Sequence, residues 1–144
     1  MKRFHFPLER VLRWRGEQAD LETMKLERLL AELRSLEGQR AQLLAERSDA
    51  ERILDTRQPM AGEELSNLDS FRRYVQARCG LLEGLKQQQE SKIAKQRAVL
   101  MEARRKYELL QRLRKKKALV WRTDNDQEHE ALAAEMFLAR RKRS

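Results

Sequence analysis

The side chains that most often perform chemistry in proteins are few and scattered in this sequence. The two histidines, His5 and His129, lie near opposite ends, and the single cysteine, Cys79, has no histidine or second cysteine beside it. Because a zinc site draws its Cys and His ligands at close spacing, this distribution does not favour a metal site. The adjacent carboxylates Glu63 and Glu64 would need a pocket to shift their pKa before either could act as an acid or base.

Nucleotide chemistry is not indicated either. The sequence contains neither the G-x-x-x-x-G-K-[ST] phosphate loop nor the G-x-G-x-x-G dinucleotide motif. A single cysteine cannot form an internal disulfide, which is typical of a reducing compartment. No run of about 18 apolar residues predicts a transmembrane segment, and the opening residues lead into charged ones rather than a signal core. We therefore expect a cytoplasmic protein that is not an enzyme and holds no cofactor or metal.

The composition favours long helices as the elements that position all side chains. Of the 144 residues, 38% are charged and only 6% are aromatic, and leucine (23) far outnumbers isoleucine (2) and valine (4). With 5 Gly and 2 Pro, turn formers are scarce as well. Sheets are rich in β-branched and aromatic residues, so this composition argues against them. The expected fold class is all-α.

A heptad stripe predicts the first helix over residues 7–56. In alternating steps of 3 and 4 residues, ten of fourteen positions are apolar, which is typical of a coiled-coil seam. Pro59 and Gly62 then predict a turn over residues 57–64. The fourteen seam positions are Leu8, Leu12, Arg15, Ala19, Glu22, Leu26, Leu29, Leu33, Leu36, Arg40, Leu43, Arg47, Ala50 and Leu54.

A second, less regular stripe begins at Leu68 and predicts a second arm over residues 65–140. Gly80 and Gly84 each cost about 1 kcal/mol within a helix, so we expect the arm to bend or divide there. The predicted molecule is a single elongated domain, a long antiparallel two-helix coiled coil or helical hairpin. It has a short broken segment near the turn and a projecting C-terminal helix over 114–144, with a weak point at 123–126.

The positive charge is concentrated in the second half of the chain. Residues 1–70 hold 12 Lys/Arg and 14 Asp/Glu, a net charge of −2, whereas residues 71–144 hold 20 and 9, a net charge of +11. A basic surface favours an acidic partner, which could be nucleic acid, anionic lipid or an acidic protein face. Charge alone does not choose among these three.

The opening segment carries a motif. The run Phe4-His5-Phe6-Pro7-Leu8-Glu9-Arg10-Val11-Leu12-Arg13-Trp14-Arg15 has the form F-x-F-x-L-E-x-V-L-x-x-R and is followed by heptads. It resembles the start of the FliJ family, the soluble coiled-coil component of the bacterial flagellar type III export apparatus. A break about sixty residues in, an aromatic restart at 68–75, a basic stretch at 106–117, Trp121 and an acidic tail follow the layout of that family.

The resemblance implies a part that works by contact. Proteins of this family look like the stalk of rotary ATPases: they enter the export ATPase hexamer, promote its assembly and activity, and couple it to the membrane export gate and to export chaperones. It therefore implies a cytoplasmic protein held peripherally at the inner membrane by the export apparatus. The candidate ring contacts are Arg10, Arg13, Arg15, Arg112, Arg114, Lys115, Lys116 and Lys117, and the candidate gate or chaperone contacts are Phe71, Tyr74, Leu82 and Leu85.

Each candidate group has a simpler interpretation. The cations are also typical of a solvated helix face, and the apolar group would equally pack against the first arm. Phe4 and Phe6 are expected to tie the N-terminus to the second arm as a hydrophobic staple. Trp14 and Trp121 should lie near one another as core filling.

Three other functions stay open. The stalk of a virulence type III secretion system would have a similar length and shape. A basic coiled coil could bind nucleic acid, but no recognised module or aromatic stacking platform supports that function, so we expect no nucleic-acid partner. A membrane scaffold is disfavoured because the cations surround the helix rather than forming one polar face.

Overall fold

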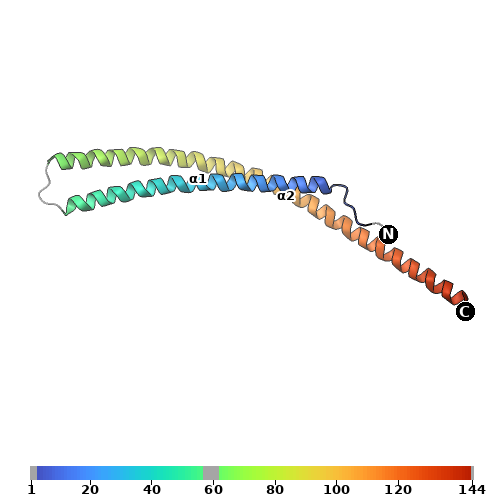
Figure 1. Ribbon diagram of the computed structural model, residues 1–144. Helices are drawn as coiled ribbons and strands as arrows, with labels where there is room; N and C mark the ends of the chain where they lie inside the picture. Colours follow the sequence, from blue (N-terminus) through green and yellow to red (C-terminus); the bar gives the residue numbers. More distant parts are fainter. Residues whose placement is uncertain (1–2, 57–61, 144) are drawn as a thin grey trace. The chain divides into compact units, whose positions relative to one another are not determined.

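The computed structural model describes residues 3–56 and 62–143, so residues 57–61 of the predicted turn, with Pro59, lie outside the described part. Two helices make up the fold: α1 (Glu9–Asp55) and α2 (Gly62–Arg143). They form the arms of an antiparallel hairpin, and the described ranges contain no strand (Figure 1). The all-α helical hairpin predicted from the sequence is confirmed.

Both helices begin close to the predicted residues. At the start of α1, the Glu9 backbone N–H donates to the Phe6 carbonyl at 3.1 Å and the Leu12 N–H donates to the Leu8 carbonyl at 2.8 Å. Helix α2 begins at Gly62, three residues before the predicted start, with Glu63 in its first turn. Acidic side chains at a helix N-terminus are stabilised by the helix dipole. The same dipole stabilises the four cations in the last turn of α2, at its C-terminus.

The expected division of the second arm is wrong. Helix α2 runs without interruption through Gly80 and Gly84, and a Cβ placed at either residue would have no neighbour within 4 Å. Both glycines therefore lie on the open side of the helix, where they do not interrupt the packed side. The expected weak point at 123–126 is helical as well, because the Thr123 hydroxyl donates to the Leu119 carbonyl at 3.0 Å and stays within its own helix.

The chain divides into two compact units, and both helices contribute to each. One is the turn-proximal unit, Leu21–Leu100. The other is the terminal unit, which combines Met1–Asp20 with Met101–Ser144. The two units are described separately below.

The core of the turn-proximal unit follows the heptad repeat of α2. Leu68, Val75 and Leu82 lie seven residues apart and are buried, as are Ile93 and Leu100. A spacing of seven residues keeps side chains on one side of a helix, facing the partner. In α1, twelve of the fourteen predicted seam positions are buried or half-buried, the exceptions being Leu8 and Arg40. The predicted seam of α1 is therefore confirmed.

Glutamines fill two further heptad positions of α2. Gln89, only 6% exposed, donates through Nε2 to the Leu29 carbonyl at 2.9 Å and to Glu32 Oε2 at 2.8 Å. One heptad later, Gln96 donates to the carbonyl of Glu22 at 3.1 Å and to its carboxylate. The hydrogen bond from Gln96, followed by the one from Lys25, lowers the pKa of the Glu22 carboxyl. These polar positions explain why the second stripe looks irregular in the sequence.

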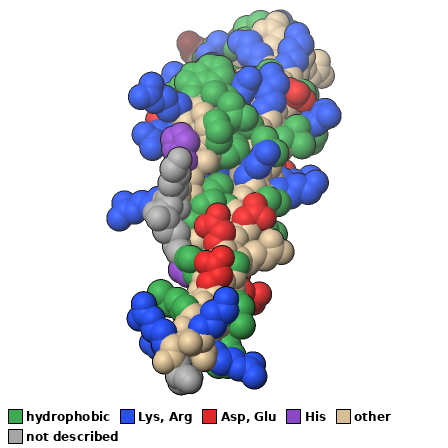
Figure 2. Space-filling view, turned by 90° about the vertical axis from the view of Figure 1, so that its right-hand side faces the viewer, with side chains coloured by type: hydrophobic (Ala, Val, Ile, Leu, Met, Phe, Trp, Pro, Cys, Tyr) green, Lys and Arg blue, Asp and Glu red, His purple; other side chains and the backbone are tan. Residues whose placement is uncertain are grey.

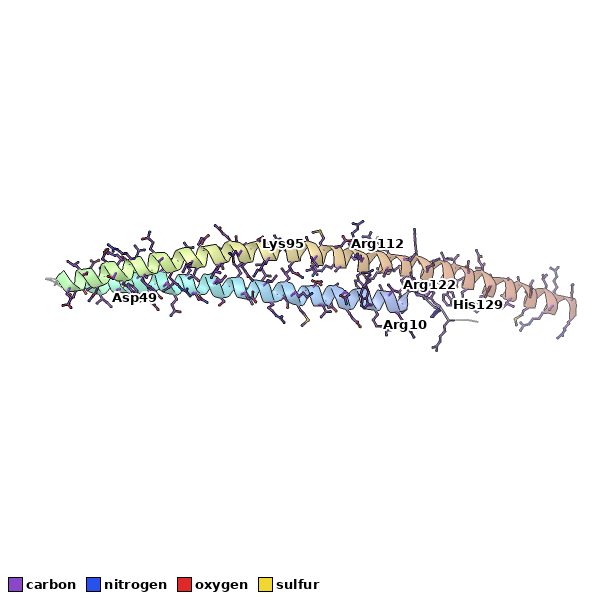
Figure 3. The ribbon with its side chains drawn as sticks, turned by 90° about the horizontal axis from the view of Figure 1, so that it is seen from above. Arg10, Asp49, Lys95, Arg112, Arg122 and His129 are labelled. Atoms are coloured by element: carbon purple, nitrogen blue, oxygen red, sulfur yellow. The ribbon has the colours of Figure 1, made fainter. Side chains whose placement is uncertain are left out.

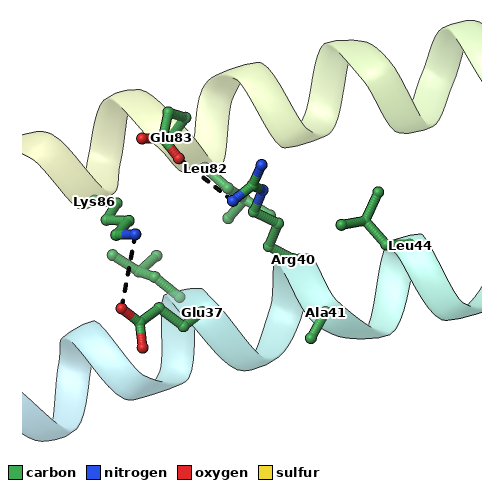
Figure 4. A pocket seen from close by; sticks show the side chains of 8 residues that line it. Glu37, Arg40, Ala41, Leu44, Leu82, Glu83 and Lys86 are labelled. Atoms are coloured by element: carbon green, nitrogen blue, oxygen red, sulfur yellow. Dashed lines mark ion pairs between the residues drawn. The ribbon is translucent and has the colours of Figure 1, made fainter.

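Ion pairs flank the seam of the turn-proximal unit. Lys86 Nζ lies 3.8 Å from Glu37 Oε1, and Arg40 Nη1 lies 3.7 Å from Glu83 Oε2 (Figure 4). Both pairs border a shallow groove between the helices, whose apolar lining is Leu36, Ala41, Leu44 and Leu82. Nearer the turn, Arg72 Nε lies 2.8 Å from Glu51 Oε1. The hydrogen bond from Arg72 is the main cause of the lowered pKa of Glu51.

Adjacent leucines on α2 give a direct test of this packing. Leu82 is 2% exposed and Leu81 is 62% exposed. Leu82→Ala should lower the free energy of unfolding by about 2–5 kcal/mol, because it removes buried methyl groups and leaves a cavity. Leu81→Ala should change it by less than about 0.5 kcal/mol. Chemical denaturation followed by circular dichroism measures both, and equal effects would contradict the assigned seam.

Candidate partner-binding surfaces

The N-terminal residues of the terminal unit are tied to α2. Phe6 is buried, and the Phe4 ring lies 6.2 Å from the Trp121 ring at an interplanar angle of 55°. Arg114 Nε lies 2.9 Å from Glu9 Oε2, and the same guanidinium stands 5.7 Å from the Phe4 ring centroid. We call these five residues the N-terminal anchor. The expected tie between Phe4 and the second arm is confirmed.

Other aromatic contacts in this unit differ from expectation. The ring partner of Trp121 is Phe4 and not Trp14, which is 48% exposed and carries the Arg15 guanidinium 4.7 Å above its ring. Sequence reasoning also missed the role of Gly16. A Cβ there would lie 3.0 Å from Tyr107 Cε2, so the absence of a side chain lets the tyrosine ring approach the helix backbone. The available signal was a lone glycine inside a strong heptad pattern.

The predicted ring contacts all lie in the terminal unit, but they do not form one patch. Successive helical positions are about 100° apart, so the run from Arg112 to Lys117 encircles α2. Figure 3 shows Arg112 and Arg10 on opposite sides of the helix pair.

Two of the eight cations have contacts within the protein. Arg114 belongs to the N-terminal anchor, and Arg15 covers Trp14. The other six are exposed and make no ion pair or side-chain hydrogen bond with any residue in the described ranges. These six, which we call the free cations, are Arg10, Arg13, Arg112, Lys115, Lys116 and Lys117.

The apolar candidates lie in the turn-proximal unit, where the structure removes one and adds another. Leu82 is buried between the helices, so it packs against the first arm and offers no surface to a partner. Its neighbour Leu81 is exposed instead. Residues 71, 74, 81 and 85 share one face of α2, because these spacings return to the same side of a helix. We call Phe71, Tyr74, Leu81 and Leu85 the apolar stripe.

The exposure of the apolar stripe suits contact with a partner. Phe71 is half-buried, Tyr74 is 57% exposed and Leu85 is 45% exposed. Beside Leu85, a second shallow groove between the helices is lined by Glu32, Ser35, Leu36, Gln88, Gln89 and Lys92. The signal for Leu81 was its spacing from Tyr74 and Leu85, which the adjacent leucine obscured.

The described residues offer neither a membrane helix nor a metal cluster. No helix among them is long and apolar enough to cross a bilayer. Within 3–56 and 62–143, no group of three or more His, Cys, Asp or Glu side chains is arranged to hold a metal ion. Of the contacts predicted from the sequence, the free cations and the members of the apolar stripe other than Leu81 remain candidates.

Comparison with known families gives a match over nearly the whole chain. The model of the flagellar FliJ protein family matches residues 4–141, nearly the whole chain. The chain belongs to the FliJ family. It is thus a component of the flagellar export apparatus, and the flagellar interpretation is favoured over the virulence one. No curated protein and no solved structure matches. Phe4, Phe6 and Glu9, which belong to the motif that carries the FliJ resemblance, are all part of the anchor.

The N-terminal anchor predicts that substituting two nearby arginines changes the stability of the protein by different amounts. Arg114→Gln should lower the free energy of unfolding by about 1 kcal/mol, since it removes an exposed ion pair and a cation–π contact. Arg112→Gln, which loses no contact with a described residue, should have no measurable effect. Amide hydrogen exchange near Glu9 provides the local measurement. Equal protection of that turn in the two variants would count against the anchor.

Proposed function

We propose that this FliJ-family chain acts as the stalk of the flagellar export ATPase. It would enter the ATPase hexamer, promote its assembly and activity, and couple it to the membrane export gate and to export chaperones. This function requires no catalysis and no cofactor. It also places the protein at the cytoplasmic face of the inner membrane, held there by the export apparatus.

The observation that carries the ring contact is the distribution of the free cations. A stalk inside a ring meets subunits on all sides, so its charges should surround the helix pair. Arg10 and Arg112 point in opposite directions, as such an arrangement requires (Figure 3). Because the free cations have no partner among the described residues, an acidic ring loop can pair with them without breaking a contact within the stalk. Arg114 and Arg15 are removed from the proposed contacts, because each already has a partner.

The ring contact is tested with a charge-reversed variant that spares Arg114. The wild-type protein should raise ATP turnover and ring formation by the cognate export ATPase. Replacing Arg112, Lys115, Lys116 and Lys117 with Glu should raise the concentration needed for half-maximal stimulation at least about tenfold, since several ion pairs of about 0.2–1 kcal/mol are lost.

The matched control reverses four other exposed cations of α2: Lys95, Arg97, Arg104 and Lys106. It changes the net charge by the same amount and should retain most of the stimulation. Both variants should keep wild-type helicity by circular dichroism. A wild-type protein without effect on turnover would refute stalk function, and equal loss in both variants would refute a localised contact.

The apolar stripe is the proposed contact for the export gate or a chaperone. Exposed aromatic and aliphatic side chains that become buried at an interface contribute most of its binding energy. Tyr74 and Leu81 are the most exposed members of the stripe, at 57% and 62%. Arg78 lies on the same face, between Tyr74 and Leu81 along the helix, and offers a polar contact there.

A triple substitution tests the stripe. Changing Tyr74, Leu81 and Leu85 to Gln should weaken binding to the isolated export gate or chaperone at least about tenfold, because burying each apolar side chain contributes about 1.5–3 kcal/mol. The control changes Val99, Met101 and Leu109, also exposed on α2, to Gln. Calorimetry or a pull-down measures binding. Unchanged affinity of the stripe variant for every gate and chaperone tested would exclude this surface.

A further inference from the structure

The last part of α2 is exposed on all sides. From residue 126 to Arg143 every side chain is exposed, and residues 126–140 make no ion pair, ring contact or side-chain hydrogen bond with another described residue. Its middle, residues 131–139, is apolar at every position except Glu135. Leu132, Met136 and Phe137 are 52%, 67% and 66% exposed. A helix that is apolar on all sides is normally buried, so this segment requires a partner surface.

Charges on either side of the apolar run have opposite signs. Four acidic residues precede it, and basic residues follow it directly. Figure 2 shows the acidic side chains as a red band on this part of α2, with the blue cations of the helix end beyond them. None of the following residues makes an ion pair with a described residue: Asp124, Asp126, Glu128, Glu130, Arg140, Lys142 and Arg143.

When two copies of this segment run in opposite directions, their charged groups are complementary. The acidic group ends immediately before the apolar run, and the basic group begins immediately after it. Two copies that pair antiparallel, apolar run on apolar run, therefore place each acidic group opposite the basic group of the other copy. A parallel pair in register would instead place like charges side by side, which is destabilising.

We propose that residues 122–143 bind the same segment of a second copy as an antiparallel helix pair. The midpoint between the acidic and basic groups is residue 134, and antiparallel pairing about this residue sets Leu132 of each copy against Met136 of the other. The acidic and basic groups flank this centre on both sides. The contact is isologous and closes at two copies, because the same patch is used by both. The proposal does not depend on the stalk function.

Oligomeric state and charge reversal test the pairing. In sedimentation equilibrium at low salt, the apparent mass of the 144-residue chain should rise with concentration from 17.2 kDa toward twice that value. Added salt should weaken the association, because the flanking contacts are ionic. One variant changes Arg140, Lys142 and Arg143 to Glu, and the other changes Asp124, Asp126 and Glu128 to Lys. Each should be monomeric alone, since both flanks then carry one sign, and an equimolar mixture of the two should dimerise.

Matched controls separate pairing from general charge effects. Reversing Lys115, Lys116 and Lys117 to Glu changes the net charge as much as the basic-end variant does, and this control should still dimerise. Leu132→Gln with Met136→Gln should abolish dimerisation, whereas Leu119→Gln with Val120→Gln, which are equally exposed but outside the run, should not. A wild-type protein that stays monomeric at all concentrations overturns the proposal, and so does a mixture that fails to restore the dimer.

Discussion

Each helix offers its neighbour one stripe of side chains, and the contact between two such stripes holds each unit together. Among the described residues, only nine are buried, and six of these lie on α2. The stripe of α1 is mostly half-buried, and leucine is its commonest residue. Because so little of each helix is buried, most side chains remain exposed, and such a chain acts through its surfaces. The FliJ family assignment is consistent with this constraint.

Polar residues within the stripes determine how the two helices are aligned. Leucines recur so regularly along α1 that the partner could slide by one heptad with little loss of apolar contact. Gln89 and Gln96 oppose such a slide, because each donates both to a backbone carbonyl and to a carboxylate of α1. A slip of one heptad in either direction would move one glutamine onto the partner of the other and take the second away from its carboxylate, and a hydrogen bond to a charged group contributes about 1.5–3 kcal/mol. The glutamines thus reduce the apolar contact between the helices but favour one register of α2 against α1.

The features that could be predicted from the sequence are those set by the heptad repeat. The features that could not be predicted depend on which side chains of the other helix a residue contacts. The seam of α1 followed from leucine spacing, because period 3.5 directly specifies the packed side. Gly80 and Gly84 were misinterpreted because intrinsic propensity is outweighed when a long helix packs on its other side. Leu81 and Leu82 are adjacent, yet Leu81 is exposed and Leu82 is buried. Because the stripe of α2 is irregular in the sequence, it could not show which of the two faces α1. The contact of Arg114 with Glu9 joins residues 105 positions apart, beyond the reach of local pattern.

The two helices use their charges differently. Of the ion pairs that join α1 to α2, three set an acidic residue of α1 against a cation of α2, which uses part of the acidic surplus of the first half. The larger basic surplus of α2 is left exposed. Exposed pairs contribute only about 0.2–1 kcal/mol each, so the fold depends mainly on the apolar seam. The proposed ring contact would depend on the unpaired charges. Ionic strength should therefore act more strongly on that contact than on whether the protein is folded.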